Sequence, residues 1–193
     1  ERAALRHLMP PDVILILNDQ NFGFAKACNQ AFSLSKGEYI LLLNPDAHLM
    51  PQCLSILRSF MTKTQNAGAV SSQVYWDSRM EYFFPHYTYP SPAQDLLVKL
   101  AKATDFLETF YSLYKRKKNL SLWKASQPQK TANLHGGVVM LSRTAVEHAG
   151  GLFDERFFMF YEDSDLFLRL KKACYKLYII PAAKAIHSYC HKK

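Results

Sequence analysis

Short apolar runs alternate with polar, helix-forming stretches over the first third of the chain. Residues 13–17 and 39–43 are continuous apolar runs, and each ends at a turn signal containing Asn and Asp. Such runs are typical of strands buried on both faces of a parallel sheet. A third strand is predicted over 68–75, with helices over 24–34 and from Pro51 onward. This β-α-β-α-β order predicts an α/β fold with a doubly wound, mostly parallel sheet flanked by helices.

The pattern also predicts which helix positions face the core and how the chain ends. Leu54, Leu57 and Met61 form the expected inward stripe of the helix that opens at Pro51. Regular elements return in the last third, where strands are expected over 138–141, over 176–180 up to Pro181, and over 183–186 up to His187, and helices over 143–149 and 163–173.

The middle of the chain carries a different signal. From residue 91 to 118 apolar residues recur at spacings of three and four, which predicts an amphipathic helix of about seven turns, or two shorter ones. Residues 91–130 hold eight basic and three acidic residues and form a helical, basic insertion in one expected domain over 1–193. Two interpretations remain open: a helix packed on its own domain with a solvated basic end, or a surface that meets anionic lipid or a lipid-linked substrate.

Composition places the chain among globular proteins. Apolar residues make up 49% and charged residues 21% of its 193 residues, and the net charge is +8. The basic excess favours acidic partners, but no nucleic-acid-binding motif is present, so nucleic acid is not an expected partner. Four scattered cysteines indicate a reducing, cytoplasmic compartment. No apolar run reaches the roughly 18 residues of a membrane span. The chain opens at Glu1, and we expect it to be incomplete at its N-terminus.

Two acidic segments could carry chemistry. Asn44-Pro45-Asp46 follows a predicted buried strand, where ligands of open α/β sheets bind and where a carboxylate can meet a divalent cation. An Asx turn explains the same residues equally well. Asp163 opens a predicted helix on its apolar side, with Leu166 and Leu170. Burying an unpaired acid costs several kcal/mol, so dipole complementation explains Glu162 and Asp165 better than it explains Asp163.

Together these segments resemble the family 2 glycosyltransferases, inverting enzymes of the GT-A fold, and especially their rhamnosyltransferase-like branch. The matching stretches run in family order from about residue 13 to residue 190 and comprise Asn21-Phe22-Gly23-Phe24-Ala25 with Asn29, residues 37–46, His135-Gly136-Gly137 with Arg143, residues 151–155 and 158–166, and Tyr175, Pro181 and His187. Each motif alone is weak, but the ordered set is specific. The family also opens with a nucleotide-binding strand that nothing before Val13 matches.

The resemblance implies roles at the matched positions. Asp46 would hold a divalent metal, Mg²⁺ or Mn²⁺, on the donor diphosphate, with His187 as a further ligand and Asn44 in place of the first acid of the family's metal motif. Asp163 would be the catalytic base and Glu162 an orienting or capping residue. Donor or substrate binding would fall to Asn21, Gly23, Asn29, Asn44, His135, Gly136, Gly137, Asp165 and Arg169.

The function that the resemblance implies is inverting sugar transfer, with rhamnose as a candidate sugar. The donor would be a nucleotide-sugar and the acceptor a glycan or lipid-linked hydroxyl, in cell-surface polysaccharide synthesis at the inner face of the plasma membrane. The main alternative is an inactive relative or fragment that binds a glycan or a partner. A nucleotidyltransferase could also use acids on an α/β sheet, but the acid-rich helix start argues against it.

Overall fold

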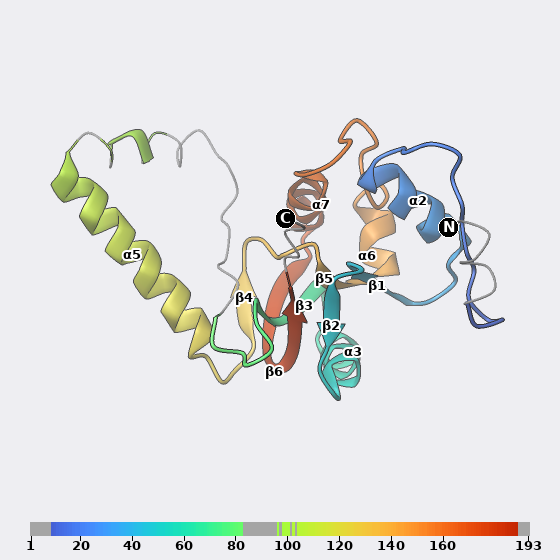
Figure 1. Ribbon diagram of the computed structural model, residues 1–193, viewed down its shortest axis with the longest axis horizontal. Coiled ribbons are helices and arrows are strands. Elements are labelled where there is room, and N and C mark those ends of the chain that lie inside the picture. The colour runs from blue at the N-terminus through green and yellow to red at the C-terminus, as the bar shows by residue number, and fades with distance from the viewer. Residues whose placement is uncertain (1–8, 83–95, 97, 101, 103, 189–193) are drawn as a thin grey trace.

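The computed structural model describes residues 9–82, 96, 98–100, 102 and 104–188. It is a mixed sheet with helices on both faces (Figure 1). The strands are β1 (Tyr39–Leu43), β2 (Ala47–Leu49), β3 (Ala67–Tyr75), β4 (Gln129–Thr131), β5 (Val138–Ser142) and β6 (Lys176–His187). The helices are α2 (Phe24–Leu34), α3 (Cys53–Lys63), α5 (Asp105–Trp123), α6 (Arg143–His148) and α7 (Glu162–Lys172).

The sheet has the order β1-β5-β3-β6-β2, and β4 pairs with β6 beside this path. The α/β class is confirmed, but the expectation of a mostly parallel sheet is wrong. Only β3 and β6 pair in parallel among the described strands, and the other pairings are antiparallel. The order of elements along a sequence does not say at which end of the sheet each strand enters, and β5 lies between β1 and β3 in the opposite direction.

Two hydrophobic clusters join the layers. α2, α6 and α7 cover one face of the sheet, and their largest buried contribution comes from Leu166, Phe167 and Leu170 of α7. α3 covers the opposite face through Cys53, Leu57 and Met61. The expected stripe of α3 is therefore correct for Leu57 and Met61 and wrong for Leu54, which is exposed while Cys53 takes the inward place.

Residues 13–17 form no strand in the described structure, although 24–34 and 39–43 form the expected helix and strand. Val13, Ile14 and Ile16 are exposed. A strand needs a hydrogen-bonding neighbour, and among the described residues no strand lies beside this segment. Its apolar composition alone is therefore not enough to fix it in the sheet.

β6 continues through Pro181, where a strand end was expected. Its pairing with β3 shifts between Ile180, opposite Ser72, and Lys184, opposite Gln73, so Pro181 lies in a bulge. Proline is tolerated there because the bulged residues donate no ladder hydrogen bond. The continuation carries the strand on to His187.

The long helix predicted from residue 91 is interrupted. Residues 98–100 are helical, and α5 begins separately at Asp105, where the Thr104 side chain accepts a hydrogen bond from the amide of Leu107 at 3.3 Å. Residues 91–95, where the prediction starts, lie outside the described residues. In the described part of the chain no helix is both long and apolar enough to span a bilayer.

Candidate active site

One pocket of about 750 Å³ lies where β1, β3 and β6 end and α7 begins, a volume typical of small-molecule sites. Asp46, Asp163 and His187, the proposed metal ligands and base, all line it. The other lining residues are Phe24, Asn44, Pro45, Trp76, His135, Gly136, Gly137, Met159, Phe160 and Glu162.

The first side of the pocket joins the end of β1 to the end of β6. His187 Nε2 lies 2.9 Å from Asp46 Oδ1 and 3.3 Å from Asn44 Nδ2. Pairing of Ala47 with His187 in the sheet fixes this register. His187 is buried, whereas the Asp46 carboxylate is 41% exposed and open to a ligand.

Asp46 and His187 fit a divalent cation as a pair of ligands. Adjacent ligands of an octahedral ion bound at about 2.1 Å lie about 3.0 Å apart, close to the 2.9 Å between Asp46 Oδ1 and His187 Nε2. No cluster of three or more His, Cys, Asp or Glu residues that could hold a metal occurs within the described ranges. A cation at this pair would therefore take its other ligands from water and substrate oxygens, as Mg²⁺ commonly does with phosphates.

The second side of the pocket is the start of α7. Asp163 Oδ1 accepts a hydrogen bond from the amide of Ser164 at 2.6 Å. Gly136 packs against this carboxylate so closely that a Cβ there would lie 2.9 Å from Asp163 Oδ2. Burial raises the pKa of Asp163, and the backbone hydrogen bonds from Ser164 and Gly136 oppose that shift. A carboxylate with a raised pKa is a stronger base, as proton abstraction requires.

Glu162 lies on the pocket, although its i, i+3 and i+7 spacing to Asp165 and Arg169 puts it on a polar face of the helix. Its side chain belongs to a residue only 6% exposed, and its Oε2 has no hydrogen-bond partner among the described residues. Burial, and secondarily the neighbouring Asp163, raises the pKa of Glu162. Helical periodicity gives the direction of a side chain but not what covers the first turn, and here Glu162 lines the same pocket as Phe24 and Phe160.

The His135-Gly136-Gly137 segment connects the two acidic sides. The amide of Gly137 donates to His135 Nδ1 at 3.1 Å, and the carbonyl of Gly137 accepts from the amide of Asn44 at 2.9 Å. The His135 and His187 rings meet edge to face at 5.1 Å between centroids. A side chain at Gly137 would lie 2.8 Å from His135 and 3.1 Å from Asn44. Both glycines therefore serve close packing at the pocket.

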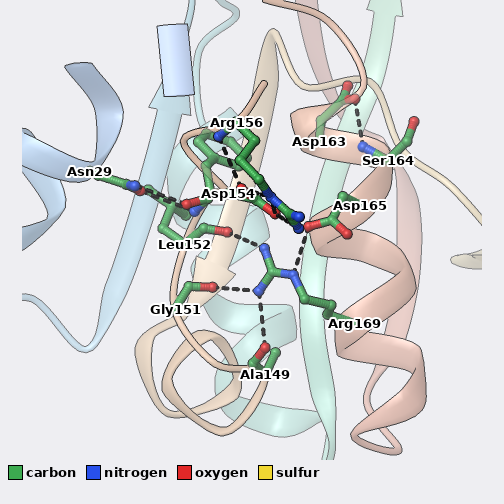
Figure 2. Close-up of polar contacts among 11 residues, drawn as sticks. Asn29, Ala149, Gly151, Leu152, Asp154, Arg156, Asp163, Ser164, Asp165 and Arg169 are labelled. Atoms are coloured by element: carbon green, nitrogen blue, oxygen red, sulfur yellow. Dashed lines mark hydrogen bonds and ion pairs between the residues drawn. The ribbon is translucent and has the colours of Figure 1, made fainter. Parts of the chain in front are cut away.

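Five other residues expected to bind substrate lie outside the pocket lining and make internal contacts. Asn29 exchanges two hydrogen bonds with the backbone of Phe153, at 2.9 and 3.0 Å, and so ties α2 to the loop that follows α6 (Figure 2). Asn21 accepts from the amide of Gly23 at 2.9 Å. Gly23 itself, with φ of 84°, touches Phe158, where a Cβ would lie 2.3 Å from the carbonyl oxygen.

Arg169 is enclosed by acceptors from its own fold. Figure 2 shows its guanidinium between Asp165, at 2.7 Å, and the carbonyl oxygens of Ala149, Gly151 and Leu152, at 2.6–3.0 Å. This network holds the turn after α6 against α7. Asp165 and Arg169 therefore position the loop that leads to Glu162 and Asp163. Neither Asp165 nor Arg169 lines the pocket.

Five pocket residues were given no role from the sequence: Phe24, Pro45, Trp76, Met159 and Phe160. Met159 and Phe160 are exposed although they are large and apolar, and Phe160 and Tyr161 both adopt left-handed backbone conformations, with φ of 71° and 69°. Such conformations are costly for non-glycine residues and concentrate at functional sites. The five large apolar residues directly before Glu162 were the available signal.

The mixed sheet, with acids from a strand end and a helix start on one pocket, is an α/β fold that matches the GT-A type. The chain belongs to the glycosyl transferase family 2, whose family model matches residues 2–149. A second model, the N-terminal domain of galactosyltransferase, matches residues 116–193.

A curated relative and a solved structure are also similar to this chain. An N-acetylglucosaminyl-diphospho-decaprenol L-rhamnosyltransferase of Mycobacterium tuberculosis is 25% identical over 94% of this chain. The chain spans 60% of the length of that relative. A crystal structure of GalNAc-T7 with UDP, GalNAc and Mn²⁺ superposes on 89% of this chain and 31% of its own, with a TM-score of 0.58 and 13% identity. This likeness shows the fold.

Proposed function

We propose that this protein transfers a sugar from a nucleotide-sugar donor to an acceptor hydroxyl, with inversion at the anomeric carbon. The observation that carries the proposal is the meeting of Asp46 and Asp163 on one pocket in a member of the glycosyl transferase family 2. The two carboxylates have different surroundings, since Asp163 is held by backbone amides and Asp46 pairs with His187. Different surroundings suit separate roles on the acceptor and donor sides.

Asp163 is the base in this proposal. An acceptor hydroxyl is a weak nucleophile at neutral pH, so a carboxylate has to take its proton as it attacks the anomeric carbon. Burial raises the pKa of Asp163 and so strengthens it as a base. The contacts with Ser164 and Gly136 fix its direction. Glu162, beside it on the pocket, orients the acceptor or the base.

Asp46 and His187 are the proposed ligands of Mg²⁺ or Mn²⁺. When bound, the ion would neutralise charge that gathers on the departing nucleoside diphosphate. The 2.9 Å separation of the two ligand atoms and the exposure of the Asp46 carboxylate support this assignment. The side-chain amide of Asn44 lies 3.3 Å from His187 Nε2, beside this pair of ligands.

The proposed substrates are suggested by the curated relative. That protein is an L-rhamnosyltransferase acting on an N-acetylglucosaminyl-diphospho-decaprenol, so we infer a nucleotide-linked rhamnose as donor and a glycan or lipid-linked glycan as acceptor. Such acceptors are consumed in cell-surface polysaccharide synthesis. We therefore place the reaction in the cytoplasm, at the inner face of the plasma membrane.

The test is a panel of nucleotide-sugars and acceptors offered to the purified full-length protein with Mn²⁺, with release of nucleoside diphosphate as the readout. Acceptor-dependent release with nucleotide-linked rhamnose supports the proposal, and NMR of the new glycosidic bond should show the anomeric configuration opposite to that of the donor. Glycan binding without turnover of any donor would favour the alternative, an inactive binding module. Retained configuration would overturn the inverting assignment.

A further inference from the structure

The surface of α5 carries apolar side chains that none of the other described elements covers. Phe106 is 78% exposed, Phe110 66%, Leu113 56% and Tyr114 59%. The spacing of these four residues, i, i+4, i+7 and i+8, puts them on one face of the helix. We call this face the α5 stripe. Contiguous exposed apolar patches of this kind mark interaction sites in soluble proteins.

The helix that carries the stripe stands apart from the sheet. Figure 1 shows α5 extending away from the sheet and from the other helices, joined at its C-terminal end. There Gln73 of β3 donates to the carbonyl of Trp123 at 2.7 Å, and Leu122 packs against the core. Gln73 is held in turn by Tyr75, whose hydroxyl donates to Gln73 Oε1 at 2.8 Å. The helix is thus anchored at one end, and its stripe is free to meet a partner.

Charge identifies the partner. Residues 91–130 carry eight basic and three acidic residues, a net +5 of the chain's +8. Lys117 lies eleven positions after Phe106 and so continues the face of the α5 stripe, with Arg116 beside it. A basic residue at the end of an apolar stripe suits a lipid surface, because its methylenes cover apolar area while its ammonium meets phosphate. A second copy of the chain would bring the same positive charge and be repelled.

We propose that α5 lies on the surface of an anionic membrane, with the α5 stripe inserted at the level of the headgroups and Arg116 and Lys117 on lipid phosphates. Gln73, which anchors the helix, stands three positions before Trp76 on the same segment, and Trp76 lines the pocket. The anchored helix would therefore hold the pocket beside the membrane. This last step rests on the proposed function, because it gives the pocket a membrane-embedded acceptor.

The test measures sedimentation of the full-length protein with vesicles of phosphatidylcholine alone or mixed with phosphatidylglycerol. We expect binding to the anionic vesicles, weaker binding to the neutral ones, and loss of affinity as salt is raised. Phe106→Ser with Phe110→Ser should weaken binding to anionic vesicles at least tenfold. Arg116→Gln with Lys117→Gln should weaken it roughly tenfold or more.

A matched control removes apolar surface elsewhere. Leu34 and Leu54 are exposed residues of α2 and α3, so Leu34→Ser with Leu54→Ser should leave vesicle binding unchanged. Circular dichroism and the melting temperature should show that all three double variants are folded. If the stripe variant fails to fold, the charge variant decides the proposal, because it changes only exposed side chains.

Three results would overturn the proposal: no vesicle binding, equal binding to both lipid compositions, or stripe and charge variants that bind like the unchanged protein. A stripe variant that instead alters the molar mass in light scattering would assign the face to a second copy. Activity separates this proposal from the proposed function. The stripe variant and the charge variant should both keep turnover on a water-soluble acceptor and lose it on an acceptor in vesicles. Vesicle binding without turnover of any acceptor would leave the membrane surface standing and remove the enzymatic proposal.

Discussion

Asp46 and His187 are separated by 141 positions in sequence, and a contact of 2.9 Å joins Oδ1 of the first to Nε2 of the second. The contact exists because β2 pairs with the C-terminal end of β6. β6 extends that far because it does not stop at Pro181 but continues through the bulge there. An acidic turn and a strand-end histidine thereby meet on the wall of the pocket, as the proposed pair of metal ligands.

The first prediction concerns this pair. Asp46→Asn removes one anionic ligand, so the Mn²⁺ concentration giving half-maximal activity should rise at least roughly tenfold. Binding of Mn²⁺ followed by electron paramagnetic resonance should weaken in parallel. Asp154→Asn is the matched control, because Asp154 pairs with Arg156 on the surface and lies outside the pocket lining. Activity that needs no divalent cation, or an Asp46→Asn protein with unchanged Mn²⁺ binding, would contradict the metal assignment.

The second prediction concerns close packing at Gly136. In Gly136→Ala the new Cβ would lie 2.9 Å from Asp163 Oδ2, so the carboxylate has to move and the turnover number should fall by at least about tenfold. Gly151→Ala is the contrasting variant, since its Cβ meets open space but its φ of 107° strains any side chain. That variant should lower the melting temperature and spare turnover. Unchanged turnover in Gly136→Ala would show that the position of Asp163 does not matter.

The third prediction decides the role of Arg169. Its guanidinium bonds to Asp165 and to three backbone carbonyls, so Arg169→Ala leaves several acceptors unsatisfied and should destabilise the fold by about 2–4 kcal/mol. The melting temperature should fall while the KM for the donor stays the same. A raised donor KM in a protein of unchanged stability would instead restore the donor-binding role that the family resemblance implies.

The local hydrophobic pattern predicted helices and strands correctly where their apolar side chains pack on the core. The helix at Phe24–Leu34 and the strand at Tyr39–Leu43 begin and end as the sequence indicates, because each apolar side packs on a single core. Residues 13–17 have the same apolar character and no strand partner in the described structure. A run of apolar residues indicates a tendency to form a strand. Forming the strand also requires a neighbouring strand to pair with, which the composition of the run does not reveal.

The acidic residues of the candidate site could be predicted from the sequence, but the other residues that line the pocket could not. Asp46 and Asp163 follow from one rule, that strand ends and helix starts gather at one sheet edge. Glu162 is buried and shares the pocket lining with Phe24, a residue distant in sequence, and the sequence pattern of α7 reveals neither fact. Trp76 is also invisible to periodicity, because it is a partly exposed residue after a strand end.

The fourth prediction separates the adjacent acids. Asp163→Asn should lower the turnover number by roughly 10²–10⁴, the usual value of general base catalysis, while donor binding is kept. Glu162→Gln should cost less, because this residue orients groups without taking the proton. Kinetics at saturating donor and metal measure both. Near-full turnover in Asp163→Asn with an inactive Glu162→Gln would reverse the two roles, and full activity in both would place the base elsewhere.

The last prediction concerns stability: the substitutions that lower turnover should raise the melting temperature. Burial raises the pKa of Asp163 and of Glu162 in the folded protein. Between the ordinary carboxyl pKa and these raised values the folded protein binds more protons than the unfolded chain, so the free energy of unfolding falls as pH rises. Asn and Gln do not titrate. Asp163→Asn and Glu162→Gln should therefore melt at a higher temperature than the unchanged protein at pH 7, by about 2–4 °C for each kcal/mol gained.

The pH dependence of this gain distinguishes it from a general effect of removing acids. The gain should shrink as the pH is lowered through the raised pKa values, because the unchanged protein then carries the same neutral groups. Asp154→Asn should behave oppositely, since hydrogen bonds from Arg156 lower the pKa of Asp154 to about 2. Its stabilising contribution is present above the ordinary carboxyl pKa and is lost as the pH falls toward 2, so this variant should melt slightly lower at pH 7. Melting temperatures measured from pH 3 to pH 8 test both directions. A gain for Asp163→Asn that persists at pH 3 would mean that the carboxylate's charge is not what destabilises the folded protein, and that the site was not built around a buried base.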